Sequence, residues 1–199
     1  MALLRASTRQ WTNCGLKGLA GVWLLMSVLL LSGGVDLPAQ TAPSREHQVK
    51  AVFLFNFAQF VEWPPQAFPE ARTPLVIGIL GEDPFGAYLD EVVGGEKVNN
   101  RPLTVQRYRR VEEIKTCHVL FISRSEADRL ERILANLKDR SILTVADTDG
   151  FARRGVMIRF STEKNKTHLK INLEAAKAAN LSISSKLLRP AEIVTPGKD

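Results

Sequence analysis

Residues 44–63 repeat their apolar side chains at spacings of three and four and contain neither glycine nor proline. This spacing places residues 49, 52, 53, 57, 60 and 61 on one face of a helix. Residues 51, 54, 55 and 58 make the opposite side apolar as well, so we expect the helix to be buried on more than one side. Pro64 and Pro65 end it, because proline donates no backbone hydrogen bond and disfavours helical geometry in the preceding residue.

Beyond this helix, short apolar runs alternate with helical patterns. Strands are predicted at residues 75–80, 103–108, 119–123 and 142–145, and helices at residues 84–93 and 125–137. Such alternation is typical of β-α-β units and a largely parallel sheet. Ser125 precedes Asp128 by three residues, which predicts that Ser125 caps the second helix.

The last third of the chain changes pattern. Two alternating runs, residues 156–161 and 168–173, flank a polar turn at residues 163–166, which predicts a β-hairpin. A short alanine-rich helix at residues 174–179 and an extended stretch at residues 183–188 follow. The fold class expected is therefore α/β: a single layered domain over residues 44–190, with a mostly parallel sheet flanked by helices and a C-terminal antiparallel hairpin.

The N-terminal residues 1–39 are typical of an export signal. Arg5, Arg9 and Lys17 precede an uncharged apolar run at residues 19–31. That run suits a signal peptide but is shorter than the ~20 residues of a membrane-spanning helix. We expect cleavage after Ala39, with a permanent anchor as the alternative, and Cys14 lies on the wrong side of the run for a lipoprotein signal.

Charge and composition argue against several functions. Removing residues 1–39 takes away three of the 27 basic and one of the 21 acidic residues, which lowers the net charge from +6 to +4. This mild, interspersed charge together with export excludes nucleic acid as the expected partner. His47, His118 and His168 lie far apart, without metal-ligand spacing. The sequence also lacks a nucleophile elbow and a phosphate loop, so we expect no enzyme, no catalytic residues, no metal and no cofactor.

Cys117 is the single cysteine that remains after residues 1–39 are removed. One interpretation is a buried, inert thiol that acts as a small hydrophobe. The other is a redox-active thiol that forms a bridge to another chain.

Two groups of residues are candidates for binding. Asp83, Ser123 and Asp147 follow three predicted strands, and ligands favour the carboxyl ends of parallel strands. The same residue types are also ordinary in turns and helix caps. The second group is the aromatic helix, where Phe53, Phe57, Phe60 and Trp63 form either core or a site for a partner protein.

Several ordered blocks carry a resemblance to a known family. They are VKAVFLFNF (49–57), FVEWP (60–64), IGILGEDPFG (77–86), CHVLFIS (117–123), LTVAD (143–147), GFA (150–152) and SSKLL (184–188). Together they resemble the YfiR/HmsC-like family of periplasmic regulatory proteins, and the resemblance extends over the chain that follows the export signal.

The resemblance implies a compact periplasmic α/β domain without catalytic activity. It implies that the protein binds and represses the periplasmic domain of an inner-membrane diguanylate cyclase, which lowers cyclic di-GMP and restrains biofilm formation. Such proteins can dimerise and respond to redox through disulfides, but Cys117 has no second cysteine in the mature chain to pair with. We expect the partner to contact the aromatic helix and Leu187 near the C-terminus. The alternative is a small-molecule-binding module that serves a histidine kinase.

Overall fold

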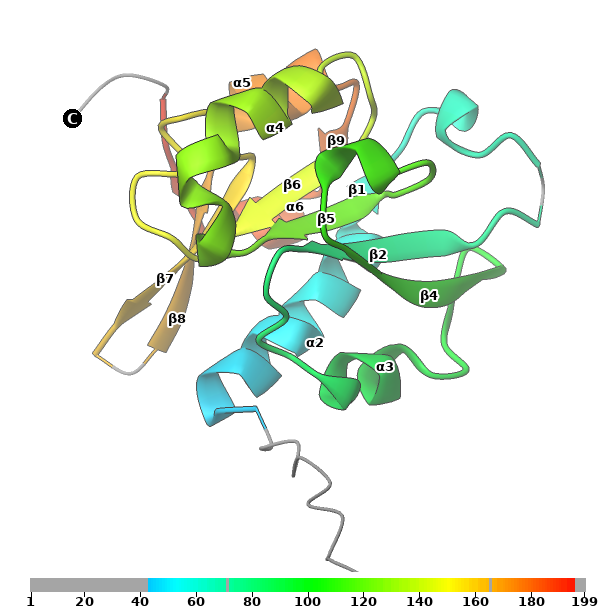
Figure 1. The fold of residues 1–199 in the computed structure, drawn as a ribbon, viewed down its shortest axis with the longest axis horizontal. Helices are drawn as coiled ribbons and strands as arrows, with labels where there is room; N and C mark the ends of the chain where they lie inside the picture. Colours follow the sequence, from blue (N-terminus) through cyan, green and yellow to red (C-terminus); the bar gives the residue numbers. More distant parts are fainter. Residues whose placement is uncertain (1–42, 71, 165, 196–199) are drawn as a thin grey trace, which may run out of the picture. The chain divides into compact units, whose positions relative to one another are not determined.

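The computed structural model describes residues 43–70, 72–164 and 166–195 (Figure 1). The expected export signal, residues 1–39, lies outside these residues. Within the described residues, no helix has both the length and the apolar character needed to span a bilayer.

The centre of the molecule is an eight-stranded sheet with the order β10-β8-β7-β6-β5-β2-β4-β3. Neighbours from β4 to β7 pair in parallel, whereas β7 and β8 form the antiparallel hairpin. The strands are β2 (Leu75–Leu80), β3 (Lys97–Val98), β4 (Arg101–Tyr108), β5 (Val119–Ile122), β6 (Leu143–Ala146), β7 (Ile158–Glu163), β8 (Lys166–Ile171) and β10 (Glu192–Ile193). A separate pair joins β1 (Val61–Glu62) to β9 (Ser182–Ile183). This arrangement confirms the expected fold class.

Helices cover both faces of the sheet, as Figure 1 shows for α2 and α3 on one side and α4 on the other. The helices are α2 (Arg45–Phe60), α3 (Ala87–Val93), α4 (Leu130–Leu137), α5 (Leu173–Ala178) and α6 (Ser185–Leu188). Three 3-10 turns add η1 (Pro65–Ala67), η2 (Val111–Glu113) and η3 (Arg124–Arg129).

Each face of the sheet has its own apolar core. Alternate residues of β2 point to opposite faces, so that Ile77 and Ile79 pack with α2 and α3, while Leu80 packs with α4. Position 78 in β2 requires glycine, because a β-carbon there would lie 2.7 Å from the sulfur of Cys117. All six residues of β2 are buried, as expected of a central strand covered on both faces.

The inward face of α2 differs from the sequence prediction. Its buried residues are Lys50, Ala51, Leu54, Phe57 and Ala58, whereas Val49 and Val52 are 39 % and 41 % exposed. A helix that is apolar nearly all round gives no clear periodic signal, so the predicted face was wrong for these two valines. The described elements therefore cover Val49 and Val52 only in part.

Two predicted local structures are also different. The stretch predicted as extended at residues 183–188 is mostly the helix α6, because the Ser184 side chain caps it by accepting a hydrogen bond from the Lys186 amide. The cap of η3 is Ser123, not Ser125. Ser125 instead accepts a hydrogen bond from the Glu82 amide and so ties η3 to the turn after β2.

Candidate functional site

A pocket of about 480 Å³ lies where the strand order of the sheet reverses. From β2 the chain crosses to β4 on one side, whereas β5 and β6 lie on the other side of β2. The crossover helices α3 and α4 pack on opposite faces, which leaves a crevice outside the carboxyl ends of β2 and β5. In open parallel sheets, this reversal point is where ligands usually bind.

The first turns of α2 form one wall of this pocket. Ser44 caps α2 by accepting a hydrogen bond from the His47 amide, and this start of the helix directs Glu46, His47 and Lys50 into the pocket. Pro84, which follows β2, and Phe121 of β5 add apolar surface. Residues from segments far apart in the sequence therefore meet in one hollow.

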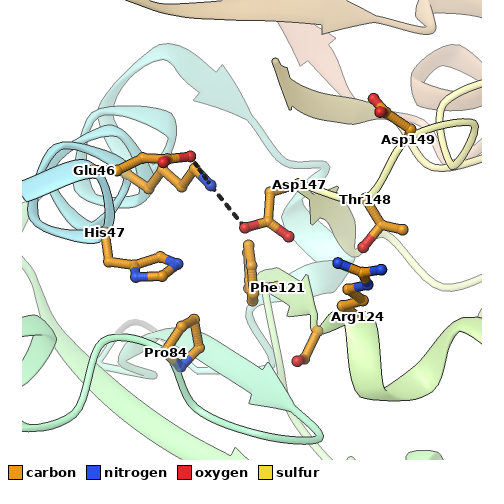
Figure 2. Close-up of a pocket in the computed structure, with 10 residues that line it drawn as sticks. Glu46, His47, Pro84, Phe121, Arg124, Asp147, Thr148 and Asp149 are labelled. Atoms are coloured by element: carbon orange, nitrogen blue, oxygen red, sulfur yellow. Dashed lines mark hydrogen bonds and ion pairs between the residues drawn. The ribbon is translucent and has the colours of Figure 1, made fainter. Parts of the chain in front are cut away.

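Lys50 is the buried charge at the centre of the site. It is 4 % exposed, and its ammonium group lies 2.7 Å from an oxygen of Glu46 and 2.7 Å from Oδ2 of Asp147. The hydrogen bond from Lys50 is the largest cause that lowers the pKa of Glu46. The pair between Lys50 and Asp147 joins α2 to the residue that follows β6, and a dashed line ends at the Asp147 carboxylate in Figure 2.

Two polar groups on the opposite wall lack protein partners. Among the described residues, no side chain or carbonyl pairs with the guanidinium of Arg124, and the buried hydroxyl of Thr148 makes no hydrogen bond. Figure 2 shows the Thr148 hydroxyl directed toward the Arg124 guanidinium. A buried hydroxyl without a partner has a free-energy cost of about 1–3 kcal/mol. The Thr148 hydroxyl is enclosed by protein atoms, so the pocket presents the guanidinium of Arg124 but not this hydroxyl.

A second hollow of about 420 Å³ adjoins the first. It shares Glu46, Lys50, Asp147 and Asp149 with the pocket and continues along β7. Arg159 pairs with Asp149 at its border. Ser161 contributes another buried hydroxyl without a partner.

The structure places two of the three predicted crevice residues in the pocket. Ser123 and Asp147 line it, at the ends of β5 and β6. Asp83 does not line it: one carboxylate oxygen accepts from the Phe85 amide, and the other lies 2.7 Å from Nε of Arg107. Asp83 therefore fixes the turn after β2, and its role as a ligand-binding residue stays a prediction without support from its position.

The residues predicted to contact a partner differ in exposure. Phe57 is 0 % exposed and stacks on Phe160 with ring centroids 5.7 Å apart, and Leu187 is 5 % exposed. Phe53, Phe60 and Trp63 are partly buried. In this conformation Phe57 and Leu187 are core residues, so a partner could contact only the other three.

The outward side of α2 adds residues that the sequence prediction assigned to the core. Val49 and Val52 are two of the three exposed large hydrophobic residues among the described residues. Helical spacing places Val49, Val52 and Phe60 on one side of α2, and we call these three residues the α2 stripe. Lys50 offered a signal for the pocket, because a lysine within an apolar helix is rarely buried without a partner.

Cys117 and His118 occupy the start of β5 and are both buried. Burial raises the pKa of the Cys117 thiol to about 12, which makes it a poor nucleophile. The whole residue is 6 % exposed. An intermolecular bridge requires an accessible thiol, and this position does not provide one.

No metal site is apparent among the described residues, since no group of three or more potential ligands lies close together there. A sequence profile described as YfiR/HmsC-like matches residues 47–192. This match includes α2, the central sheet and the hairpin. No curated protein matches the chain.

Proposed function

Because the chain belongs to the YfiR/HmsC-like family, we propose that it is a periplasmic protein that binds the sensor domain of an inner-membrane diguanylate cyclase and holds the enzyme inactive. The family is regulatory rather than catalytic and acts in periplasmic cyclic di-GMP signalling. The match over residues 47–192 is the observation that carries the proposal.

The α2 stripe supports a partner contact on this helix. Two valines that are 39 % and 41 % exposed and a partly exposed phenylalanine lie on one side of α2. Exposed apolar residues that gather on one surface commonly mark a site of protein association. If the stripe binds one conformation of the sensor more tightly than the other, the inactive population rises by that difference in affinity.

The proposal is tested in cells that lack the chromosomal copy of this protein. Loss of the protein should raise cyclic di-GMP, and a plasmid copy should lower it again. A copy with Val49→Lys and Val52→Lys should be exported and folded but should fail to lower cyclic di-GMP. Ile193→Lys is the matched control, because Ile193 is 49 % exposed and lies on β10, away from α2.

Two results would contradict the proposal. Unchanged cyclic di-GMP in the deletion strain rejects the cyclase as the target. Full repression by the double variant, with the protein present at the normal level, rejects the α2 stripe as the contact.

A histidine kinase is the second candidate for the enzyme served. The pocket beside Lys50 favours it, because a small-molecule-binding protein could report ligand occupancy to such a sensor. Under this alternative, the deletion changes phosphorylation of a response regulator and leaves cyclic di-GMP constant.

A further inference from the structure

The pocket beside Lys50 presents charges of both signs. Its lining includes the cationic side chains of Lys50 and Arg124 and the carboxylates of Glu46, Asp147 and Asp149. The position of the pocket at the reversal of strand order provides an independent reason to expect a ligand there. The charges and hydrogen-bonding groups of the pocket determine which chemical class of ligand it can bind.

The interactions already made inside the protein show which groups stay available. Lys50 is held by Glu46 and by Oδ2 of Asp147. Oδ1 of Asp147 has no partner among the described residues, and Arg124 and the hydroxyl of Thr148 have none either. The hydroxyl of Thr148 is enclosed by protein atoms, so the site offers the guanidinium of Arg124 on one wall and a carboxylate oxygen of Asp147 at its centre (Figure 2).

A ligand with a single charge does not match this arrangement. An anion at Arg124 would lie in a pocket that also contains three carboxylates, and a cation at Asp147 would face Lys50 and Arg124. A molecule with a carboxylate at one end and an ammonium group at the other satisfies both walls. A volume of about 480 Å³ is within the usual range for small-molecule sites.

We infer that the pocket binds a free α-amino acid. Its carboxylate accepts hydrogen bonds from the Arg124 guanidinium, and its ammonium group donates to Oδ1 of Asp147. The apolar surface of Pro84 and Phe121 lies beside the ligand. Binding here does not depend on the membrane partner proposed above, so the two proposals can fail separately.

The test uses the purified protein and each free L-amino acid in turn. Thermal unfolding should show that at least one amino acid raises the Tm, and calorimetry should then show binding at one site per chain. Arg124→Gln should weaken that binding by about tenfold or more, the usual effect of removing a hydrogen bond to a charged group.

Matched controls separate the site from general effects of charge. Arg132→Gln removes an exposed arginine on α4, outside the pocket, and should leave the affinity unchanged. The N-acetyl derivative and the carboxamide derivative of the bound amino acid each lack one of the two charges and should both fail to bind. The inference is overturned if no amino acid raises the Tm, if Arg124→Gln binds as the wild type does, or if either derivative binds equally well.

Discussion

His118 joins a peripheral turn to the start of the sheet through its imidazole ring. Its Nδ1 accepts a hydrogen bond from the Val76 amide at 3.0 Å. The proton must then be on Nε2, which donates to the Ala67 carbonyl at 3.1 Å. Phe68 stacks on the ring at 4.5 Å between centroids, and His118 is 1 % exposed. The bond from the Val76 amide requires an unprotonated Nδ1 and therefore the neutral ring.

We expect His118 to make the fold sensitive to mild acid. Burial is the main cause that lowers its pKa below the usual 6.5. The neutral ring is therefore favoured in the folded state, and its contribution to stability is complete above the unfolded pKa. That contribution falls as the pH decreases toward the lowered folded pKa. Urea unfolding from about pH 7 to about pH 5 should show a falling free energy of unfolding.

The variant His118→Asn is the control for this prediction. Asparagine keeps an oxygen that can accept from the Val76 amide but does not titrate in this range. The variant should be less stable than the wild type at neutral pH and should lose less stability on acidification. An identical loss in both proteins would assign the acid sensitivity to other groups.

At the scale of elements, the two sides of α2 should respond differently to truncation. Phe57→Ala removes a fully buried ring that stacks on Phe160 and should lower the free energy of unfolding by about 3–5 kcal/mol. Val52→Ala removes methyl groups from a side chain that is 41 % exposed and should change it by less than about 0.5 kcal/mol. Urea titration of both variants measures the contrast. Similar losses would mean that Val52 is covered in solution.

The same helix shows what the sequence can and cannot predict. The strand at residues 75–80 coincides with β2, because a short apolar run between polar segments has few alternatives as a buried strand. The inward face of α2 was not predictable in the same way, since apolar residues surround the helix. The two-residue strands β1 and β9 form by pairing with each other. Such short strands have no hydrophobic pattern of their own, so the sequence did not predict them.

Site residues show a similar division. Ser123 and Asp147 were predicted correctly to lie beside the pocket. Both follow parallel strands, and the carboxyl ends of parallel strands lie at the same edge of the sheet. The same reasoning also placed Asp83 in the pocket, because the sequence does not show that its carboxylate binds Arg107 and the Phe85 amide. Lys50 reaches Asp147 across 97 positions of sequence, and a contact of that range follows only from the folded topology.

At the scale of the whole molecule, the protein should be insensitive to thiol redox conditions. The described residues contain one cysteine, and burial raises its pKa to about 12. For the chain without residues 1–39, which include Cys14, we expect the Tm to be the same with a thiol oxidant as with a reductant. A thiol reagent should label Cys117 only after urea is added, and Cys117→Ala should abolish the labelling of this shortened chain. Rapid labelling of the native protein, or a disulfide-linked dimer, would contradict this expectation.

The ion pair between Lys50 and Asp147 also has a consequence for biosynthesis. Proteins are made from the N-terminus at about 5–20 residues per second, and 97 positions separate these two residues. The helix α2 therefore exists for roughly 5–20 s before its ionic partner has been synthesised, and Phe160, on which Phe57 stacks, comes later still. During this interval the apolar side chains of α2 have no sheet to pack against. Among the described helices, α2 is synthesised first but obtains its tertiary contacts late.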